Sequence, residues 1–196
     1  MDHPKFEQGY DVDTYVRNIR NYRSLVRSLM EKANANDDHA RALEQRAAAY
    51  EQPVRATIMT EDWCGDSALN TPVLASLFDK AGIELRIFRG SEHADLKDKY
   101  ESEGDDHIPV ISLWDGTGNE VGRWIEAPAA VEQRKNEWKA ERPEFMELYE
   151  KQKSDKEAAR KFATLYREFL EEMAGWYEGG MWDETTREVT DLLKKS

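Results

Sequence analysis

The chain has 196 residues, enough for one sizeable domain or for a small domain with substantial extensions. Its 6 Trp, 8 Tyr and 6 Phe exclude a disordered chain, and 35% charged residues predict a very polar surface over the core. A formal net charge of -12 repels phosphate backbones and anionic lipids, so we expect neither a nucleic acid nor a membrane partner.

The start of the sequence lacks the apolar stretch of a signal peptide, and no apolar run approaches the ~18 residues that span a bilayer. Cys64 is the single cysteine, so no disulfide can form within the chain. Single-cysteine usage of this kind fits a reducing compartment, and we expect a cytoplasmic protein.

The first 52 residues are predicted to be helical. From Tyr15 to Leu29, apolar residues recur at steps of three and four, which predicts one amphipathic helix. A second helix should begin near Asp37 or Asp38 and end before Pro53. Residues 1–52 therefore form a predicted N-terminal helical extension.

Residues 53–128 alternate short apolar strands with helices. The predicted order is strand, helix, strand, helix, strand, strand, over Val54–Thr60, Ser67–Lys80, Ile83–Phe88, His93–Ser102, Ile108–Trp114 and Glu120–Ile125. This order predicts an α/β domain with a mixed four-stranded sheet and flanking helices.

Residues 129–196 are charged and helical, and we expect them to pack on the same core. Apolar side chains from Phe162 to Tyr177 form an amphipathic stripe, which is either core packing or a docking face. Gly179 and Gly180 should end that helix, and a short final helix carries Val189. The two helical extensions also suggest a homodimer.

The turn Trp63-Cys64-Gly65-Asp66-Ser67 follows the first predicted strand and opens the next helix. Free N–H groups and a partial positive charge at a helix start favour a thiolate, the nucleophile of disulfide exchange. Asp62 and Asp66 act against this, so we expect an exposed, reactive thiol only mildly more acidic than a free one. The alternative is a small buried hydrophobic residue.

This turn resembles the reactive turn of the thioredoxin superfamily. Pro72 lies eight residues after Cys64, where thioredoxins have a proline in their active-site helix, and Gly122 follows the hairpin as it does in that family. Ile108-Pro109 matches the family's cis-proline, which lies against the reactive sulfur. The run Thr60-Glu61-Asp62-Trp63-Cys64-Gly65-Asp66 is most similar to a bacterial thioredoxin-like subgroup, most of whose members are uncharacterised.

The resemblance implies a role for each residue of the turn. Cys64 would be the attacking nucleophile, and Ser67 stands where thioredoxins have the resolving cysteine, so the motif is CxxS. The Ser67 hydroxyl either donates to the thiolate or is an ordinary first-turn serine. The substrate-binding surface would be made of Trp63, Gly65, Asp66, His107, Ile108 and Pro109.

Two departures limit the likeness. Thioredoxins bury an aspartate six residues before the cysteine, and here that position is Ile58. His107 is the titratable group near Pro109 that could replace it, or it is an incidental loop residue. The Cys-Gly-x-Ser pattern is also similar to monothiol glutaredoxins, but their preceding lysine, Thr-Val-Pro and Gly-Gly-x-Asp elements are missing.

We therefore predict a monothiol redox protein, with Cys64 forming a mixed disulfide that an external thiol releases. Its partner would be a disulfide-bearing or thiolated protein or a small thiol. The alternatives are a redox-inactive binding module of the same fold and a glutaredoxin-like binder of glutathione or an iron–sulfur cluster. One cysteine and scattered histidines predict no metal site, and we expect no cofactor.

Overall fold

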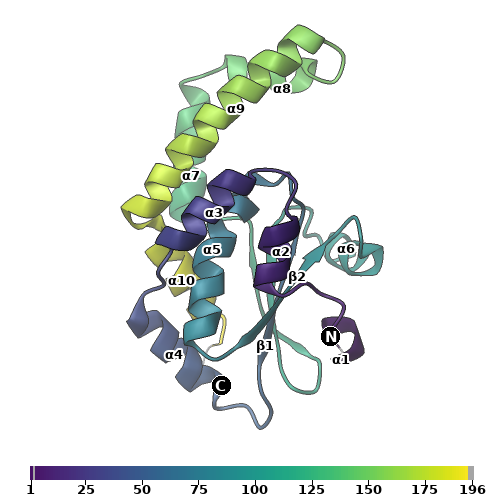
Figure 1. Ribbon diagram of the computed structural model, residues 1–196, viewed down its shortest axis with the longest axis vertical. Helices are drawn as coiled ribbons and strands as arrows, with labels where there is room; N and C mark the ends of the chain where they lie inside the picture. The colour runs from purple at the N-terminus through teal and green to yellow at the C-terminus, as the bar shows by residue number, and fades with distance from the viewer. Residues whose placement is uncertain (2, 194–196) are drawn as a thin grey trace. The chain divides into compact units, whose positions relative to one another are not determined.

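The computed structural model describes residues 1 and 3–193. Its centre is one mixed sheet of β1 (Arg55–Thr60), β2 (Glu84–Arg89), β3 (Val110–Trp114) and β4 (Glu120–Ile125), in the order β2-β1-β3-β4 (Figure 1). β1 and β2 are parallel, whereas β1 with β3 and β3 with β4 are antiparallel. The predicted mixed four-stranded sheet is therefore confirmed.

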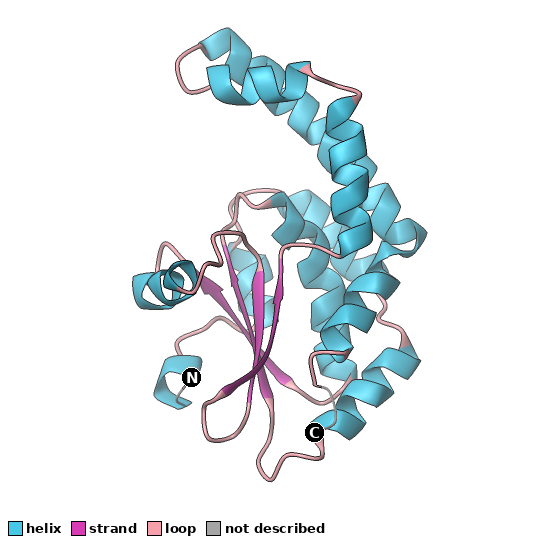
Figure 2. Cartoon of the chain, turned by 180° about the vertical axis from the view of Figure 1, so that it is seen from behind, coloured by secondary structure: helices cyan, strands magenta, loops and turns pink. Residues whose placement is uncertain are grey.

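Helices cover the two faces of this sheet (Figure 2). On one face lies α5 (Gly65–Lys80), which is buried along most of its length and contacts α3 (Arg23–Lys32), α4 (Asp37–Ala47) and α10 (Trp182–Thr190). On the other face lies α6 (Ala94–Ser102), where Leu96 and Tyr100 pack on Met59, Phe88 and Val110. Side chains alternate between the faces along each strand, so the short apolar strands serve both layers.

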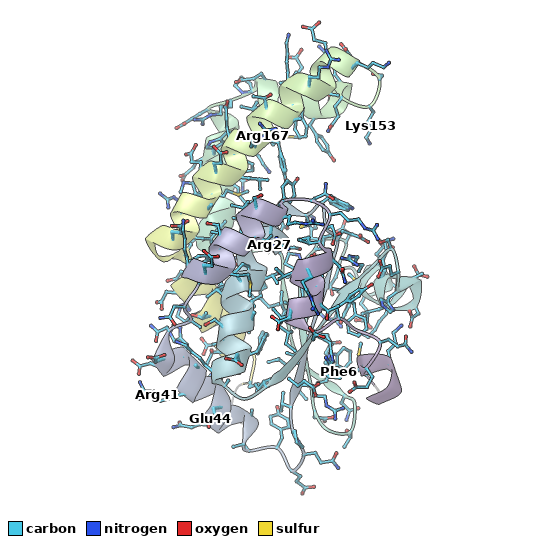
Figure 3. The ribbon with its side chains drawn as sticks, in the orientation of Figure 1. Phe6, Arg27, Arg41, Glu44, Lys153 and Arg167 are labelled. Atoms are coloured by element: carbon cyan, nitrogen blue, oxygen red, sulfur yellow. The ribbon has the colours of Figure 1, made fainter. Side chains whose placement is uncertain are left out.

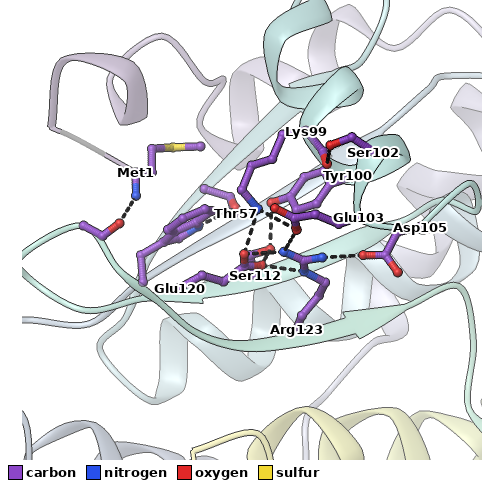
Figure 4. Close-up of polar contacts among 12 residues, drawn as sticks. Met1, Thr57, Lys99, Tyr100, Ser102, Glu103, Asp105, Ser112, Glu120 and Arg123 are labelled. Atoms are coloured by element: carbon purple, nitrogen blue, oxygen red, sulfur yellow. Dashed lines mark hydrogen bonds and ion pairs between the residues drawn. The ribbon is translucent and has the colours of Figure 1, made fainter.

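A paired polar cluster joins α6 to the β3–β4 hairpin (Figure 4). The Ser112 hydroxyl donates to Glu120 at 2.6 Å and shares a 2.7 Å hydrogen bond with the Tyr100 hydroxyl. Lys99 Nζ and Arg123 Nε donate to the same carboxylate at 2.9 and 2.7 Å. Burial opposes ionisation of Glu120, but the hydrogen bonds from Arg123, Ser112 and Lys99 outweigh it and hold its pKa at about 2.

The N-terminal segment covers the outer edge of β2. After α1 (His3–Phe6), Tyr10 exchanges two backbone hydrogen bonds with Ile87, at 2.9 and 2.8 Å. A side chain at Gly9 would place its Cβ 2.6 Å from the Phe88 ring, so only glycine allows this close approach. Phe6, which is labelled in Figure 3, is buried. The guanidinium groups of Arg55 and Arg86 lie over its ring, 5.1 and 5.6 Å from the centroid.

The single helix predicted from Tyr15 to Leu29 is wrong, because the chain forms two helices there. α2 (Val12–Asn18) ends at Ile19, which is extended, and α3 begins after Tyr22, whose φ is 54°. Where α2 ends, backbone groups bind side chains: Asn18 O, in the last residue of α2, accepts from Arg89, and Arg20 N–H donates to Asp62. Tertiary hydrogen bonds have replaced the helical ladder that the apolar spacing predicted.

The chain forms two compact units, Met1–Ala127 with Trp182–Ser196, and Pro128–Met181. The second unit contains α7 (Ala129–Ala140), α8 (Glu144–Lys151), α9 (Lys156–Trp176) and a wide turn at Tyr177–Met181. The final helix, α10, groups with the sheet and not with the helices that precede it. The predicted division into 1–52, 53–128 and 129–196 stays a prediction.

Aromatic side chains from three helices form the interior of the second unit. The Trp138 ring of α7 lies 4.3 Å from Phe169 of α9 and 5.4 Å from Phe145 of α8, between ring centroids. Phe162, in the predicted stripe, lies 5.3 Å from Phe145. The stripe on α9 is thus packed within its own unit, at least in part.

Over residues 1 and 3–193, we find no helix whose length and apolar character would let it cross a bilayer.

Candidate active site

Cys64 is the N-cap residue of α5. The chain leaves β1 at Thr60 and makes a tight turn, closed by a 3.0 Å hydrogen bond from Cys64 N–H to Glu61 O. Cys64 has extended backbone angles, and its sulfur accepts from the Ser67 N–H at 3.5 Å. A sulfur therefore stands where Ser or Asp commonly caps a helix, beside the free N–H groups of the first turn.

The loop before β3 lies against this sulfur. The Ile108-Pro109 peptide bond is cis, and Cys64 Sγ donates to Ile108 O at 3.3 Å. The contact between Cys64 and the cis-proline loop, expected from the resemblance, is therefore present. It places the sulfur between a helix N-terminus and an extended backbone segment.

The environment of Cys64 differs from what we predicted. The residue is 7% exposed, so the expectation of an exposed thiol is wrong. Its pKa is raised to about 11, mainly by burial and also by the Asp66 carboxylate, against the opposing effect of Ser67 and of the backbone N–H groups of the first turn. The predicted mild increase in acidity is also wrong, because desolvation outweighs the helix terminus.

The other residues of the turn are divided between interior and surface. Gly65 and Ser67 are buried in the first turn of α5, and Asp66 is half-buried. Ser67 Oγ lies close enough to the sulfur to favour its ionised form, yet it makes no hydrogen bond of good geometry within residues 1 and 3–193. Trp63 is 61% exposed, a large apolar surface directly before the cysteine.

His107 points to a carboxylate and not to the sulfur. Its Nδ1 lies 2.8 Å from Glu126 Oε2, its Nε2 lies 3.4 Å from Asp106, and its side chain is 63% exposed. A sequence position near Pro109 suggested His107 as a proton acceptor for Cys64, but the nearest charged partner of His107 is Glu126.

A family model described as thioredoxin matches residues 9–140. The chain belongs to the thioredoxin family. Among the curated proteins, nothing matches it.

Two solved structures share the fold. A protein of unknown function from Pseudomonas aeruginosa is 18% identical with a TM-score of 0.62, covering 98% of this chain and 97% of that one. An HIV epitope scaffold is 24% identical with a TM-score of 0.51, covering 67% of this chain and 81% of that one. At these identities, both show the thioredoxin fold alone.

A buried ion pair supports the reactive turn of this thioredoxin-family chain, and the sequence analysis missed it. Arg89 Nε donates to Asp62 Oδ1 at 2.8 Å, with the arginine side chain 4% exposed. The guanidinium also lies over the rings of Tyr10 and Tyr15, at 4.9 and 5.4 Å. An arginine at the end of an apolar strand, beside the reactive turn, was the available signal.

A buried amide, Asn70, was missed as well. Asn70 Nδ2 donates to Asp66 O at 3.0 Å and to Glu126 O at 3.5 Å, and its Oδ1 accepts from Thr185 at 2.8 Å. A fully buried asparagine within a helix is unusual because it must find buried hydrogen-bond partners. This residue connects the first turn of α5 to the chain that follows β4.

A cavity lies elsewhere in the sheet unit. It has a volume of about 870 Å³ and is lined by Lys99, Trp114 and Arg123 among others, beside the polar cluster of Figure 4. Because those polar groups already pair with each other, and the reactive sulfur is at the cis-proline loop, we assign the candidate site to Cys64. Within residues 1 and 3–193, no group of three or more His, Cys, Asp and Glu side chains could hold a metal ion.

Proposed function

We propose that this protein is a monothiol member of the thioredoxin family that exchanges disulfides through Cys64. The supporting observation is the position of Sγ, at the N-cap of α5 and 3.3 Å from the carbonyl of Ile108 in the cis-proline loop. Trp63 supplies an exposed apolar surface next to it. The proposed partner is a disulfide-bearing or thiolated protein.

The reaction proceeds in two balanced exchanges. The Cys64 thiolate attacks one sulfur of a partner disulfide, forms the mixed disulfide and expels the other sulfur as a thiolate, which takes a proton from water. An external low-molecular-weight thiolate then attacks the mixed disulfide and releases Cys64. Because Cys64 is the only cysteine, this second thiol must come from solution, and we propose a reducing compartment such as the cytoplasm.

Burial predicts slow reaction with small reagents and an advantage for peptides. With a pKa of about 11, on the order of one sulfur in ten thousand is ionised at pH 7. The sulfur donates to Ile108 O, which favours the protonated form. A docked peptide N–H that takes over this carbonyl would remove that contact, so an extended polypeptide suits the site better than a small disulfide.

The first test measures the alkylation of Cys64 by iodoacetamide between pH 7 and 11. We expect a rate well below that of a free thiol at pH 7, rising about tenfold per pH unit towards pH 11, because only the thiolate reacts. A peptide mixed disulfide should exchange with Cys64 faster than a small disulfide of equal reduction potential. Failure of every disulfide to react, with alkylation intact, would contradict the exchange function.

The second test restores a resolving cysteine. Ser67→Cys creates a Cys-Gly-Asp-Cys turn at a helix start, whose geometry suits a disulfide. We expect dithiol reductase activity to appear, with Ser67→Ala as the control that removes the hydroxyl alone. A variant that forms the bond and reduces nothing would favour a binding role.

A binding module that retains the fold without turnover is the second candidate. It is favoured by the low exposure of Cys64 and by its raised pKa. In that case Cys64→Ser would bind the same partner with unchanged affinity. If Cys64 exchanges disulfides, the Cys64→Ser variant forms no mixed disulfide and captures no partner covalently.

A further inference from the structure

Glu126, at the end of β4, has an unusual backbone conformation. Its φ is 64°, in the left-handed region that favours glycine and, among other residues, asparagine. It is one of two non-glycine residues with positive φ in the part of the chain that the structure describes. A residue stays in this region only where surrounding contacts hold it there.

Among the contacts that hold Glu126, two go to the cis-proline loop. Its N–H donates to Pro109 O at 2.8 Å, and its Oε2 lies 2.8 Å from His107 Nδ1. These contacts reach the loop on both sides of Ile108, the residue whose carbonyl accepts from the Cys64 sulfur.

A further contact of Glu126 goes to the helix that carries Cys64. Glu126 O accepts from Asn70 Nδ2 at 3.5 Å, and the same amide donates to Asp66 O in the first turn of α5 at 3.0 Å. Asn70 is completely buried. Glu126 therefore contacts both sides of the candidate site: the cis-proline loop directly, and the start of α5 through Asn70.

We propose that Glu126 is a positioning residue that sets the distance between the His107–Pro109 loop and the Cys64 sulfur. It acts through the loop that it holds. The proposal rests on the proposed function for its effect on exchange, but its effect on the sulfur is independent of that function. With the loop held, the sulfur stays on Ile108 O and an extended backbone is presented to a partner.

Glu126→Asn tests the role of the side chain. Asparagine accepts a left-handed backbone, but it is one methylene too short to keep the 2.8 Å contact with His107. Glu126→Gln is the matched variant, because its amide oxygen can still accept from the His107 ring. Arg46→Ala is the control for general loosening, since Arg46 binds Thr190 O and Asp191 in the same unit, and neither belongs to the loop or to the reactive turn.

Two rates are measured well below the melting temperature of every variant: alkylation of Cys64 by iodoacetamide, and exchange with a peptide mixed disulfide. Glu126→Asn removes the side-chain contact with His107 and keeps the backbone bond to Pro109, so the loop is held less firmly against the sulfur. Alkylation should then rise at least about fivefold while peptide exchange falls about tenfold, the effect of one lost hydrogen bond. Glu126→Gln and Arg46→Ala should stay within about twofold of the original protein in both rates.

If the original protein exchanges with no disulfide, only the proposed function is refuted. The alkylation rate still tests the positioning role of Glu126 in that case. An Asn variant that alkylates at the rate of the parent, or changes no more than the Arg46 variant, would overturn the positioning role.

Discussion

The two units of the chain both have apolar interiors, but they differ in the side chains that make their most specific buried contacts. The sheet unit buries charged and amide groups beside its reactive turn, in the Arg89–Asp62 pair and the Asn70 contacts. The helical unit buries aromatic rings contributed by α7, α8 and α9. Aromatic packing tolerates changes of detail, whereas a buried polar contact requires defined geometry. The difference indicates where this chain requires exact positions, which is around Cys64.

The helical unit is an insertion between β4 and α10. The chain that enters it is fixed to α5 at Asn70, through Glu126 O. The chain that leaves it is fixed one residue earlier, because Trp182 Nε1 donates to Leu69 O at 2.9 Å. The two chain segments that flank the insertion are therefore hydrogen-bonded to the same turn of α5.

The largest expected effect comes from removing α10. Truncation after Pro143 deletes this helix, whose Val189 is fully buried and whose Thr185 binds Asn70. We expect the sheet unit to unfold or aggregate, because its core and the Asn70 network both lose a partner. Replacing residues 128–181 by a short Gly/Ser linker should instead leave a folded, soluble sheet unit.

Circular dichroism melting and size-exclusion chromatography of the two deletions provide the measurement. A truncation after Pro143 that stays monomeric and equally stable would contradict the assignment of α10 to the sheet unit. A linker variant that fails to fold would show that the two units depend on each other.

The next effect concerns the buried charge next to the reactive turn. Arg89→Leu leaves Asp62 buried without its main counterion and should lower the free energy of unfolding by about 3–5 kcal/mol. Arg20→Ala is the matched control: its side chain is 75% exposed and lies 4.0 Å from the same carboxylate, so a change below about 1 kcal/mol is expected. Urea unfolding of both variants measures the difference. Equal losses in the two variants would show that burial of the Arg89 ion pair adds nothing to the free energy of unfolding.

The smallest effect is the pH dependence supplied by Glu120. Its pKa falls from an ordinary value of 4.5 to about 2 in the folded protein, so the stabilisation is complete above pH ~4.5 and is lost as the pH falls towards 2. Glu120→Gln should remove on the order of 2–3 kcal/mol at pH 7 and much less at pH 2. Urea unfolding of both proteins at several pH values tests this. A difference in the free energy of unfolding that stays constant with pH would show that the partners of Glu120 do not lower its pKa.

The mixed sheet and the reactive turn could both be predicted from the sequence, because both depend on local patterns. Short apolar runs between helical segments identified β1 to β4, and the Ile108-Pro109 step identified the cis-proline loop. The burial of Cys64 could not be predicted, since a position at a helix start does not reveal how much of the protein covers the side chain. The break at Ile19 was missed for a similar reason, because its cause, the Arg89–Asp62 pair, is distant in sequence.

The backbone pairing of Tyr10 with Ile87 has a consequence for self-association. An edge strand with free N–H and C=O groups is a template on which a second chain can add a strand. Tyr10 occupies both groups of Ile87 in the middle of β2, and Gly9 brings the chain close enough for this. The N-terminal segment thus covers this edge through one bridge at Tyr10, and removing it would leave the Ile87 N–H and C=O groups open to pairing with a second chain.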